Sequence, residues 1–165
     1  MERVTFILTL AVLLLLSAPV LRADTEVSDG LYLVAEFQEG NENMWMDVLK
    51  FTSEQCVSIA IKGKNTDGVV RKIFVLFYTA DDWAKFVDAW KKGRAAPPPA
   101  SLNDLALGDF LDQDKSMLQL SLRSDGTMLI NAVNKDQNLC MFVLSKDNFK
   151  AMDDAVSELA GYFKN

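Results

Sequence analysis

The sequence contains no histidine and only two cysteines among its 165 residues. Without histidine the chain cannot build a Ser-His-Asp or Cys-His nucleophilic site, and it lacks the commonest zinc and copper ligand. It also has no Ser-x-x-Lys motif, no glycine-rich phosphate loop and no Asn-x-Ser/Thr sequon. We therefore expect a protein that is not an enzyme and that holds no metal or cofactor.

Basic residues are also scarce. The chain has 17 Lys and Arg against 23 Asp and Glu, which gives a formal net charge of −6. Negative charge repels phosphate backbones and anionic lipid surfaces, both of which attract basic proteins. The composition thus disfavours nucleic acid as a partner, whereas a basic protein partner would suit the charge.

The chain has one long apolar run, which extends from Val4 to Leu21 behind Arg3. Ala23 is the small residue that stands just before the polar segment 24–26. A basic residue, an apolar stretch and a small residue are the parts of a secretory signal peptide. We expect residues 1–23 to be that signal, so that the protein is periplasmic or secreted and keeps no membrane span after cleavage. An uncleaved anchor is the alternative, because about 18 apolar residues is near the minimum for spanning.

The rest of the chain repeats itself. Its pattern of apolar and polar residues recurs in three pairs of stretches: 35–37 with 108–110, 49–61 with 120–132, and 79–83 with 145–149. The repeat predicts a first unit over residues 24–94, a proline-rich linker over 95–104 around Pro97-Pro98-Pro99, and a second unit over 105–165.

Each unit is predicted to contain several strands. Strand 56–62 shows the two-residue alternation of a half-buried strand, and Asp125-Gly126 between two apolar alternations indicates a hairpin. The other strands expected are 30–38, 45–51 and 71–78 in the first unit, and 118–123, 127–134 and 139–144 in the second.

Each unit is predicted to end in one amphipathic helix. Thr79 and Ser145 precede the two helices as N-caps, and Gly93 ends the first. Apolar residues recur at helical spacing, so each helix has one face to bury: Trp83, Phe86, Val87 and Trp90 in the first, and Phe149, Met152, Val156, Leu159 and Phe163 in the second. The predicted fold class is α+β, with two tandem related units, each an antiparallel strand meander followed by one helix.

Neither unit can easily hide both faces of its own sheet. The two units are therefore expected to cover each other, either as one continuous sheet or as two sheets with the helices packed together. If an apolar face or an edge stays exposed, the same reasoning allows a homodimer.

This order of strands and helix, present twice over residues 35–90 and 108–163, resembles the β-β-β-β-α unit of the Whirly and PUR-repeat superfamily. The resemblance is one of element order, without a shared sequence motif. It implies single-stranded nucleic-acid binding through basic and aromatic sheet surfaces, which the acidic charge and the export signal contradict. The topology alone is carried over.

Two sets of residues are candidate sites. Cys56 and Cys140 can form a disulfide in an oxidising compartment, or stay as buried free thiols. Met44, Trp45 and Met46 follow a polar stretch and could form an exposed tip for an adaptable apolar contact, or else face the core.

Acidic clusters are weaker candidates. Asp109, Asp112 and Asp114 could bind calcium, although an ordinary turn explains them equally and no closing glutamate follows. The pairs 81–82 and 153–154 resemble catalytic carboxylates, but they lie in predicted helices, where the first pair suits the helix dipole and the second faces solvent.

By exclusion, the sequence favours an exported, non-catalytic binding or protein-interaction module. Two alternatives remain, namely a hydrolase that uses carboxylates alone, and single-stranded nucleic-acid binding by analogy of fold.

Overall fold

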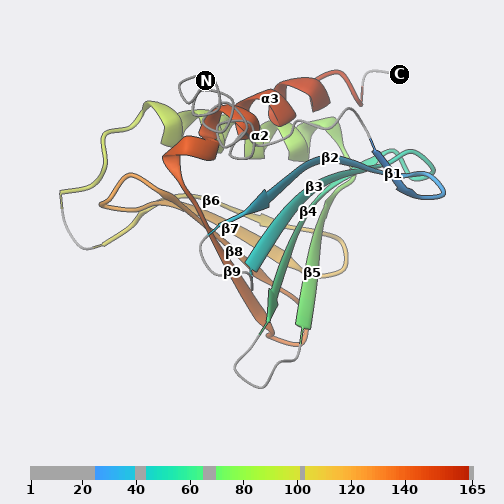
Figure 1. The fold of residues 1–165 in the computed structure, drawn as a ribbon, viewed down its shortest axis with the longest axis horizontal. Coiled ribbons are helices and arrows are strands. Elements are labelled where there is room, and N and C mark those ends of the chain that lie inside the picture. Colours follow the sequence, from blue (N-terminus) through green and yellow to red (C-terminus); the bar gives the residue numbers. More distant parts are fainter. Residues whose placement is uncertain (1–24, 40–43, 65–69, 101–102, 164–165) are drawn as a thin grey trace, which may run out of the picture.

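The computed structural model of the chain describes residues 25–39, 44–64, 70–100 and 103–163. The predicted signal peptide lies outside these residues. The fold is α+β and consists of two antiparallel sheets, each followed along the chain by a helix (Figure 1). The predicted fold class is thereby confirmed.

The first sheet has five strands that neighbour one another in chain order. They are β1 (Thr25–Ser28), β2 (Leu31–Gln38), β3 (Met44–Phe51), β4 (Cys56–Lys64) and β5 (Val70–Phe77), and helix α2 (Ala80–Ala95) follows. Strand β1 was not predicted, because its four residues are all exposed and carry no apolar alternation.

The second sheet has four strands, also in chain order. They are β6 (Leu105–Leu111), β7 (Met117–Leu122), β8 (Met128–Val133) and β9 (Leu139–Leu144), followed by the short 3₁₀ helix η1 (Lys146–Asn148) and helix α3 (Phe149–Leu159). Apart from β1 and β6, every strand had been predicted to within two residues at each end.

The two units share a local irregularity. The pairing register shifts between Leu33 and Ala35 in β2, and between Ala106 and Gly108 in β6. These two β-bulges lie at the same relative position as the repeated stretches 35–37 and 108–110. A bulge leaves one residue unpaired and bends its strand, so each unit bends its first long strand at the same point.

The structure corrects one detail of the sequence repeat. Val48 pairs with Ile59, and Leu120 pairs with Ile130. Strands β3 and β7 therefore correspond through Val48 and Leu120, whereas the sequence had aligned Leu49 with Leu120. The error is one residue, because Val48 and its partner Ile59 are eleven positions apart, whereas Leu120 and its partner Ile130 are ten positions apart.

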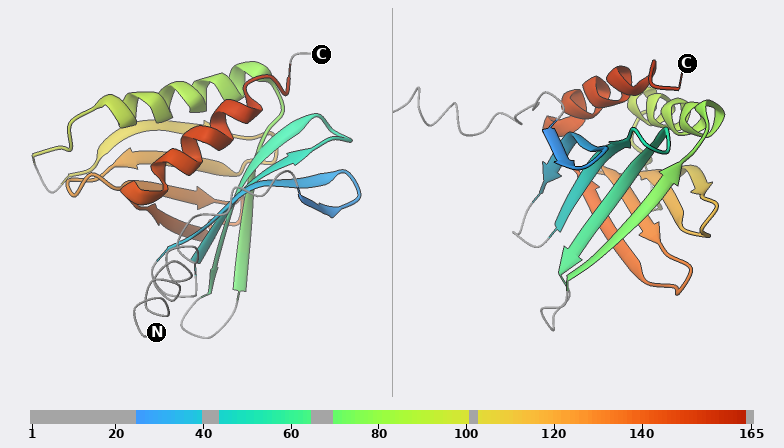
Figure 2. Two further views of the ribbon diagram at one scale, coloured as in Figure 1. Left: turned by 45° about the horizontal axis from the view of Figure 1, so that its top comes forward. Right: turned by 90° about the vertical axis from the view of Figure 1, so that its right-hand side faces the viewer.

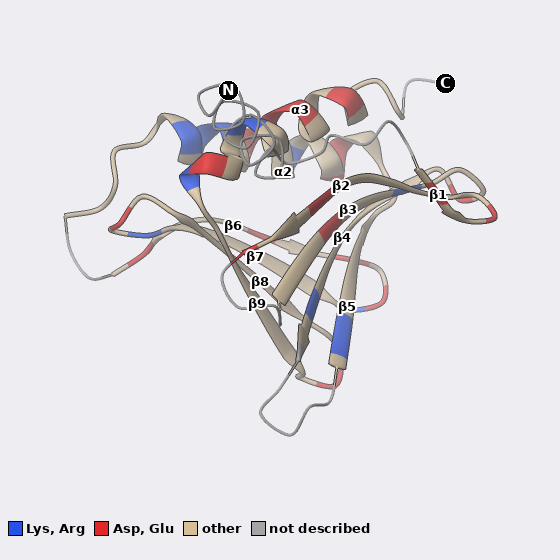
Figure 3. Ribbon diagram, in the orientation of Figure 1, with Lys and Arg blue, Asp and Glu red and all other residues tan. Residues whose placement is uncertain are grey.

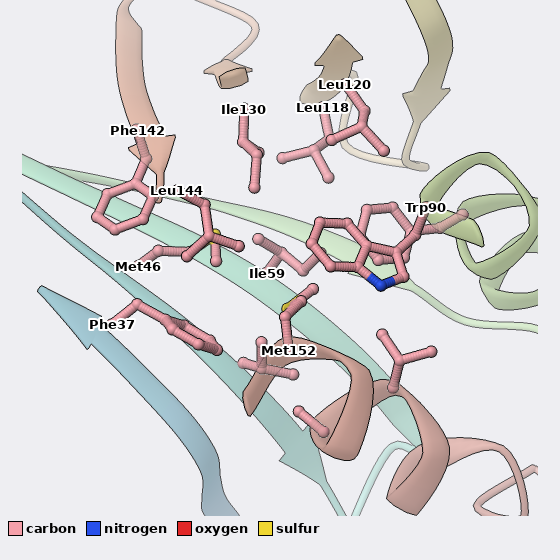
Figure 4. Packing of buried hydrophobic residues seen from close by; sticks show 14 of the residues in the cluster. Phe37, Met46, Ile59, Trp90, Leu118, Leu120, Ile130, Phe142, Leu144 and Met152 are labelled. Carbon is pink, nitrogen blue, oxygen red and sulfur yellow. The ribbon is translucent and has the colours of Figure 1, made fainter. Parts of the chain in front are cut away.

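The sheets face each other and diverge from one end, and the helices lie across the wider end (Figures 1 and 2). Strands β4 and β5 contact β8 and β9 directly. Trp90 of α2 and Met152 of α3 reach into the space between the sheets, where they meet side chains from both (Figure 4). One continuous hydrophobic core therefore serves both units.

Each helix packs against the sheet of the other unit. Helix α2, from the first unit, contacts β6 and β7 and touches its own sheet mainly at β5. Helix α3, from the second unit, contacts β2. The units are thus interlocked by exchanged helices, and neither sheet is covered by its own unit alone.

Polar contacts reinforce this exchange. The Trp90 Nε1–H donates to Asp153 Oδ1 at 2.7 Å, and Arg94 pairs with Asp153 Oδ2 at 3.3 Å. Tyr162 donates its hydroxyl hydrogen to the Phe51 carbonyl at 2.7 Å. The C-terminal helix and turn are therefore bonded to the first unit at two separate places.

Two carboxylates also join the units. Glu39 Oε1 accepts hydrogen bonds from the Ser145 N–H at 2.7 Å and from the Asn148 amide at 2.8 Å. Asp112 Oδ2 accepts from the Leu76 N–H of β5 at 3.2 Å. In this way each unit supplies a hydrogen-bond acceptor to the backbone of the other.

The helix ends were predicted in part. Thr79 caps α2 by accepting from the Asp82 N–H at 3.1 Å, as expected. Ser145 precedes η1 but makes no side-chain cap, and its N–H is satisfied by Glu39 instead. Gly93 does not end α2. It lies inside the helix, where an added Cβ would stand 2.4 Å from Leu107, so it permits the close approach of α2 to the second sheet.

Candidate binding surface

The two cysteines are free and buried, and the structure keeps them far apart. Cys140 Sγ lies beside Gly63, near the end of β4, whereas Cys56 begins that strand. Seven positions along a strand span about 23 Å, far beyond disulfide reach. The disulfide candidate is wrong in this fold. Burial raises the pKa of Cys56 to about 11, with a further contribution from Glu54, and burial also raises the pKa of Cys140.

Thiol titration tests this arrangement. In the native protein we expect neither thiol to react with Ellman's reagent on the time scale of an exposed cysteine, because both are buried and protonated at neutral pH. In denaturant without reductant, both thiols should react at once. A protein that releases no thiol under those conditions, but releases two after reduction, would contradict the assignment.

The three residues of the predicted exposed tip, Met44, Trp45 and Met46, differ in their burial. Met46 is completely buried in the core, so the prediction of exposure is wrong for it. Met44 is half-buried against the same core. Trp45 is half-buried on the opposite face of β3, where the Lys62 ammonium lies 4.6 Å from its ring centroid. The alternation of a strand places Trp45 and Met46 on opposite faces.

Trp45 belongs to a mixed cluster on the outer face of the first sheet. Lys72 pairs there with Asp47 at 2.7 Å and lies 5.0 Å from the Phe74 ring centroid. Asp47 thus neutralises Lys72, and Glu36 lies opposite Asp47 on β2 as a second acid on this face. Figure 3 shows basic residues on β4 and β5.

The acidic residues near the start of the second unit serve the fold. Asp112 is buried and accepts from the Ser116 N–H at 2.8 Å as well as from Leu76, and Asp109 accepts from Gln119 at 3.3 Å. Within the part of the chain that the structure describes, no three His, Cys, Asp or Glu side chains are grouped to hold a metal ion. The turn explanation therefore accounts for Asp112, the most buried of the three.

The helix carboxylates also have partners. Asp153 was expected to face solvent, but it holds Trp90 and Arg94, and Asp154 pairs with Lys150 at 2.6 Å. The pKa of Asp82 is lowered by side-chain hydrogen bonds from Lys85 and Thr79. An acid held ionised in this way is a poor proton donor at neutral pH.

Asp82 and Asp109 line one small hollow together with Lys85 and Phe110. Its volume is about 120 Å³, below the roughly 300–1,000 Å³ of most small-molecule sites. A larger hollow of about 340 Å³ runs along α2 beside Trp83, Val87 and Phe163. Asp81 and Asp88 also line the larger hollow, but both are exposed and lie two turns apart along α2, so they do not face each other across a cleft.

The second sheet has an outer face, turned away from the core, that is almost free of charge. Its four strands contain a single charged residue, Asp109. In Figure 3, β7, β8 and β9 carry no charge colour along their length. The strand pairing arranges the outward side chains in three rows across the sheet: Leu111, Met117, Val133 and Leu139; Asp109, Gln119, Asn131 and Met141; Ala106, Ser121, Leu129 and Val143.

Large apolar side chains on this outer face are accessible to solvent. Leu111 is 71% exposed, Leu139 is 49% exposed and Met141 is 48% exposed. The remaining outward residues of β7 and β8 are half-buried, and no described helix contacts the face. Four strands of about six residues cover about 20 by 20 Å, or roughly 400 Å². This lies within the range of the largest, often functional, patches on monomeric proteins.

Sequence reasoning missed this face although a signal was present. Strand β9, Leu139–Leu144, is apolar at all six positions, so both its faces are apolar. A run of this kind is typical of a strand that is buried on both faces. In this fold β9 is buried on its inner face only, and Leu139 and Met141 on its outer face stay exposed.

Comparison with known proteins gave no match, either among protein-family models or among curated proteins. No helix in the described residues is long and apolar enough to cross a membrane.

Proposed function

We propose that this is an exported, non-catalytic interaction protein that binds a protein partner through the outer face of its second sheet. The single observation that carries the proposal is the uncovered apolar row of that face, which contains Leu111 and Leu139. Apolar side chains gathered on one rigid sheet gain free energy when a partner removes them from water, by about 25 cal/mol per Å². A core of this kind surrounded by polar turns is typical of protein interfaces.

The charge around the face does not require a basic partner. Its hairpin turns carry acids and bases side by side: Asp112 and Asp114 with Lys115, Arg123 with Asp125, and Lys135 with Asp136. The acidic residues that give the chain its negative charge lie mainly elsewhere. The partner is therefore expected to be apolar at its centre and mixed in charge at its rim.

The nucleic-acid role implied by the resemblance to the Whirly and PUR-repeat proteins fits less well. It needs basic and aromatic groups free to meet phosphates and bases. The second sheet has no Lys or Arg on its strands. On the first sheet, Lys72 is paired with Asp47, so the net charge offered to a phosphate backbone is small.

Comparing two variants of equal charge tests the proposal. Met141→Glu places a carboxylate in the middle row of the face, whereas Val27→Glu places one at an exposed apolar position on β1, where the wild-type valine is 59% exposed. When immobilised protein is mixed with an extract of the export compartment, wild type and Val27→Glu should retain the same partner. Met141→Glu should retain at least tenfold less, because burying an unpaired charge is costly. Equal recovery by all three proteins would contradict the proposal.

A further inference from the structure

We propose that the partner of this outer face is a second copy of the same chain, with the two second sheets packed face to face about a two-fold axis. The inference rests on the proposed function, since it names the occupant of the same surface. The observation that carries it is the order of residues across the face. When two copies pack face to face, this order brings compatible side chains together in one orientation and like charges together in the other.

The position of Asp109 selects the orientation. A two-fold axis that exchanges two packed faces lies in the plane between them. If the axis crosses the strands, β6 lies over β6 of the second copy, and the two Asp109 carboxylates oppose each other. If the axis runs along the strands, β6 lies over β9 of the second copy, and Asp109 meets Met141. The second arrangement avoids a buried pair of like charges.

The same orientation aligns apolar groups. Each row of the face then lies over the same row of the second copy, read in the opposite direction. Leu111 comes over Leu139 of the second copy, and Met117 comes over Val133. Two sheets that pack in this aligned way stand about 10 Å apart, with their facing side chains interdigitated. The row with the most exposed residues is thus buried against itself.

The middle row offers a polar match. Gln119 lies beside Asn131 on β7, and in the proposed dimer Gln119 of the second copy lies over Asn131. Each side-chain amide can donate and accept hydrogen bonds, so the polar residues of one copy face polar residues of the other.

The turns at one end of the face are complementary in charge. The β6–β7 turn, with Asp114 and Lys115, comes over the β8–β9 turn of the second copy, with Lys135 and Asp136. None of these four side chains forms an ion pair within the described part of the chain. Each turn thus presents an acid and a base to the other, so unlike charges can pair across the dimer.

The area of the face determines how tightly the two copies are expected to bind. A face of roughly 400 Å² is about half of the 800 Å² that each partner contributes to an interface of standard size. The polar hairpin turns add further area at the edge of the interface. We expect a reversible dimer with a dissociation constant on the order of micromolar, in the range of small interfaces.

Sedimentation of the protein, purified as the expressing cell processes it, tests the inference. Wild type should change from monomer to dimer as its concentration rises from low to high micromolar. Met141→Glu should weaken the dimer at least tenfold, because the new carboxylate lies over Asp109 of the second copy, and Val27→Glu should leave it unchanged. Lys135→Glu should weaken it several-fold, and adding Asp114→Lys in the same chain should restore it, because the two turns meet between copies.

Two outcomes would overturn the dimer. One is a wild-type protein that remains monomeric at every concentration, and the other is a dimer that Met141→Glu leaves intact. A monomeric wild type whose capture of another protein is still abolished by Met141→Glu would end the second-copy inference and leave the proposed function standing. If Met141→Glu loses neither the dimer nor capture, both proposals fail. Circular dichroism of each variant shows whether it keeps the wild-type fold.

Discussion

Expressed as separate chains, the two halves of this protein should fail to fold, and mixing them should restore the structure. A break after Pro98 separates each sheet from the helix that covers it. Helix α2 belongs to the first half but packs on β6 and β7 of the second, and helix α3 belongs to the second half but packs on β2 of the first. Leaving even half a dozen core side chains in water costs on the order of 10 kcal/mol. That is comparable to the whole stability of a typical domain, about 5–15 kcal/mol.

The measurement is a comparison of NMR spectra. Each half alone should give the narrow amide dispersion of an unfolded chain, and the equimolar mixture should give the dispersion of the intact protein. The control is the intact chain with a protease site inserted beside Pro97-Pro98-Pro99 and cut after folding, which should keep its native spectrum. A cooperative unfolding transition in either half alone would show that the helix exchange is dispensable.

Replacing Trp90 by alanine should cost about 3–5 kcal/mol of unfolding free energy, the range measured for large aromatic side chains in protein cores. Trp90 is only 1% exposed, and its ring meets Phe149 of α3 edge-on at 5.5 Å between centroids. The substitution also removes the indole N–H that donates a hydrogen bond to Asp153. It therefore removes a packing contact and a hydrogen bond between the exchanged helices at once.

Urea unfolding followed by circular dichroism measures this loss. Trp45→Ala is the matched control, because Trp45 is half-buried on the outer face of the first sheet and is not a member of the shared core. It should cost about 1 kcal/mol or less. If the two substitutions destabilise the protein equally, Trp90 does not hold the units together as described.

Sequence reasoning recovered the elements but not their partners. The alternation of β4 and the stripe containing Trp83, Phe86 and Trp90 depend on local spacing, which a sequence displays directly. The choice of sheet that a helix covers depends on contacts between residues more than 100 positions apart, such as Tyr162 with Phe51. No periodicity within either segment encodes that choice.

The candidate site shows the same limit. The sequence singled out Met46 as an exposed contact, and the structure buries it. Strand alternation predicts that neighbours such as Trp45 and Met46 face opposite ways, but it does not say which side is covered. In the same way, the apolar run of β9 does not indicate that Leu139 and Met141 lie on an open face. Which faces remain open is decided only when both sheets and both helices are in place.

The exchanged helices also affect the order in which the chain can fold. The α3 segment that covers β2 follows both sheets along the chain, so the first sheet lacks this cover until the second unit has been synthesised. Contacts so distant in sequence form slowly, because the loop they close is costly in entropy. The core that the two units share can therefore close only after α3 has emerged from the ribosome.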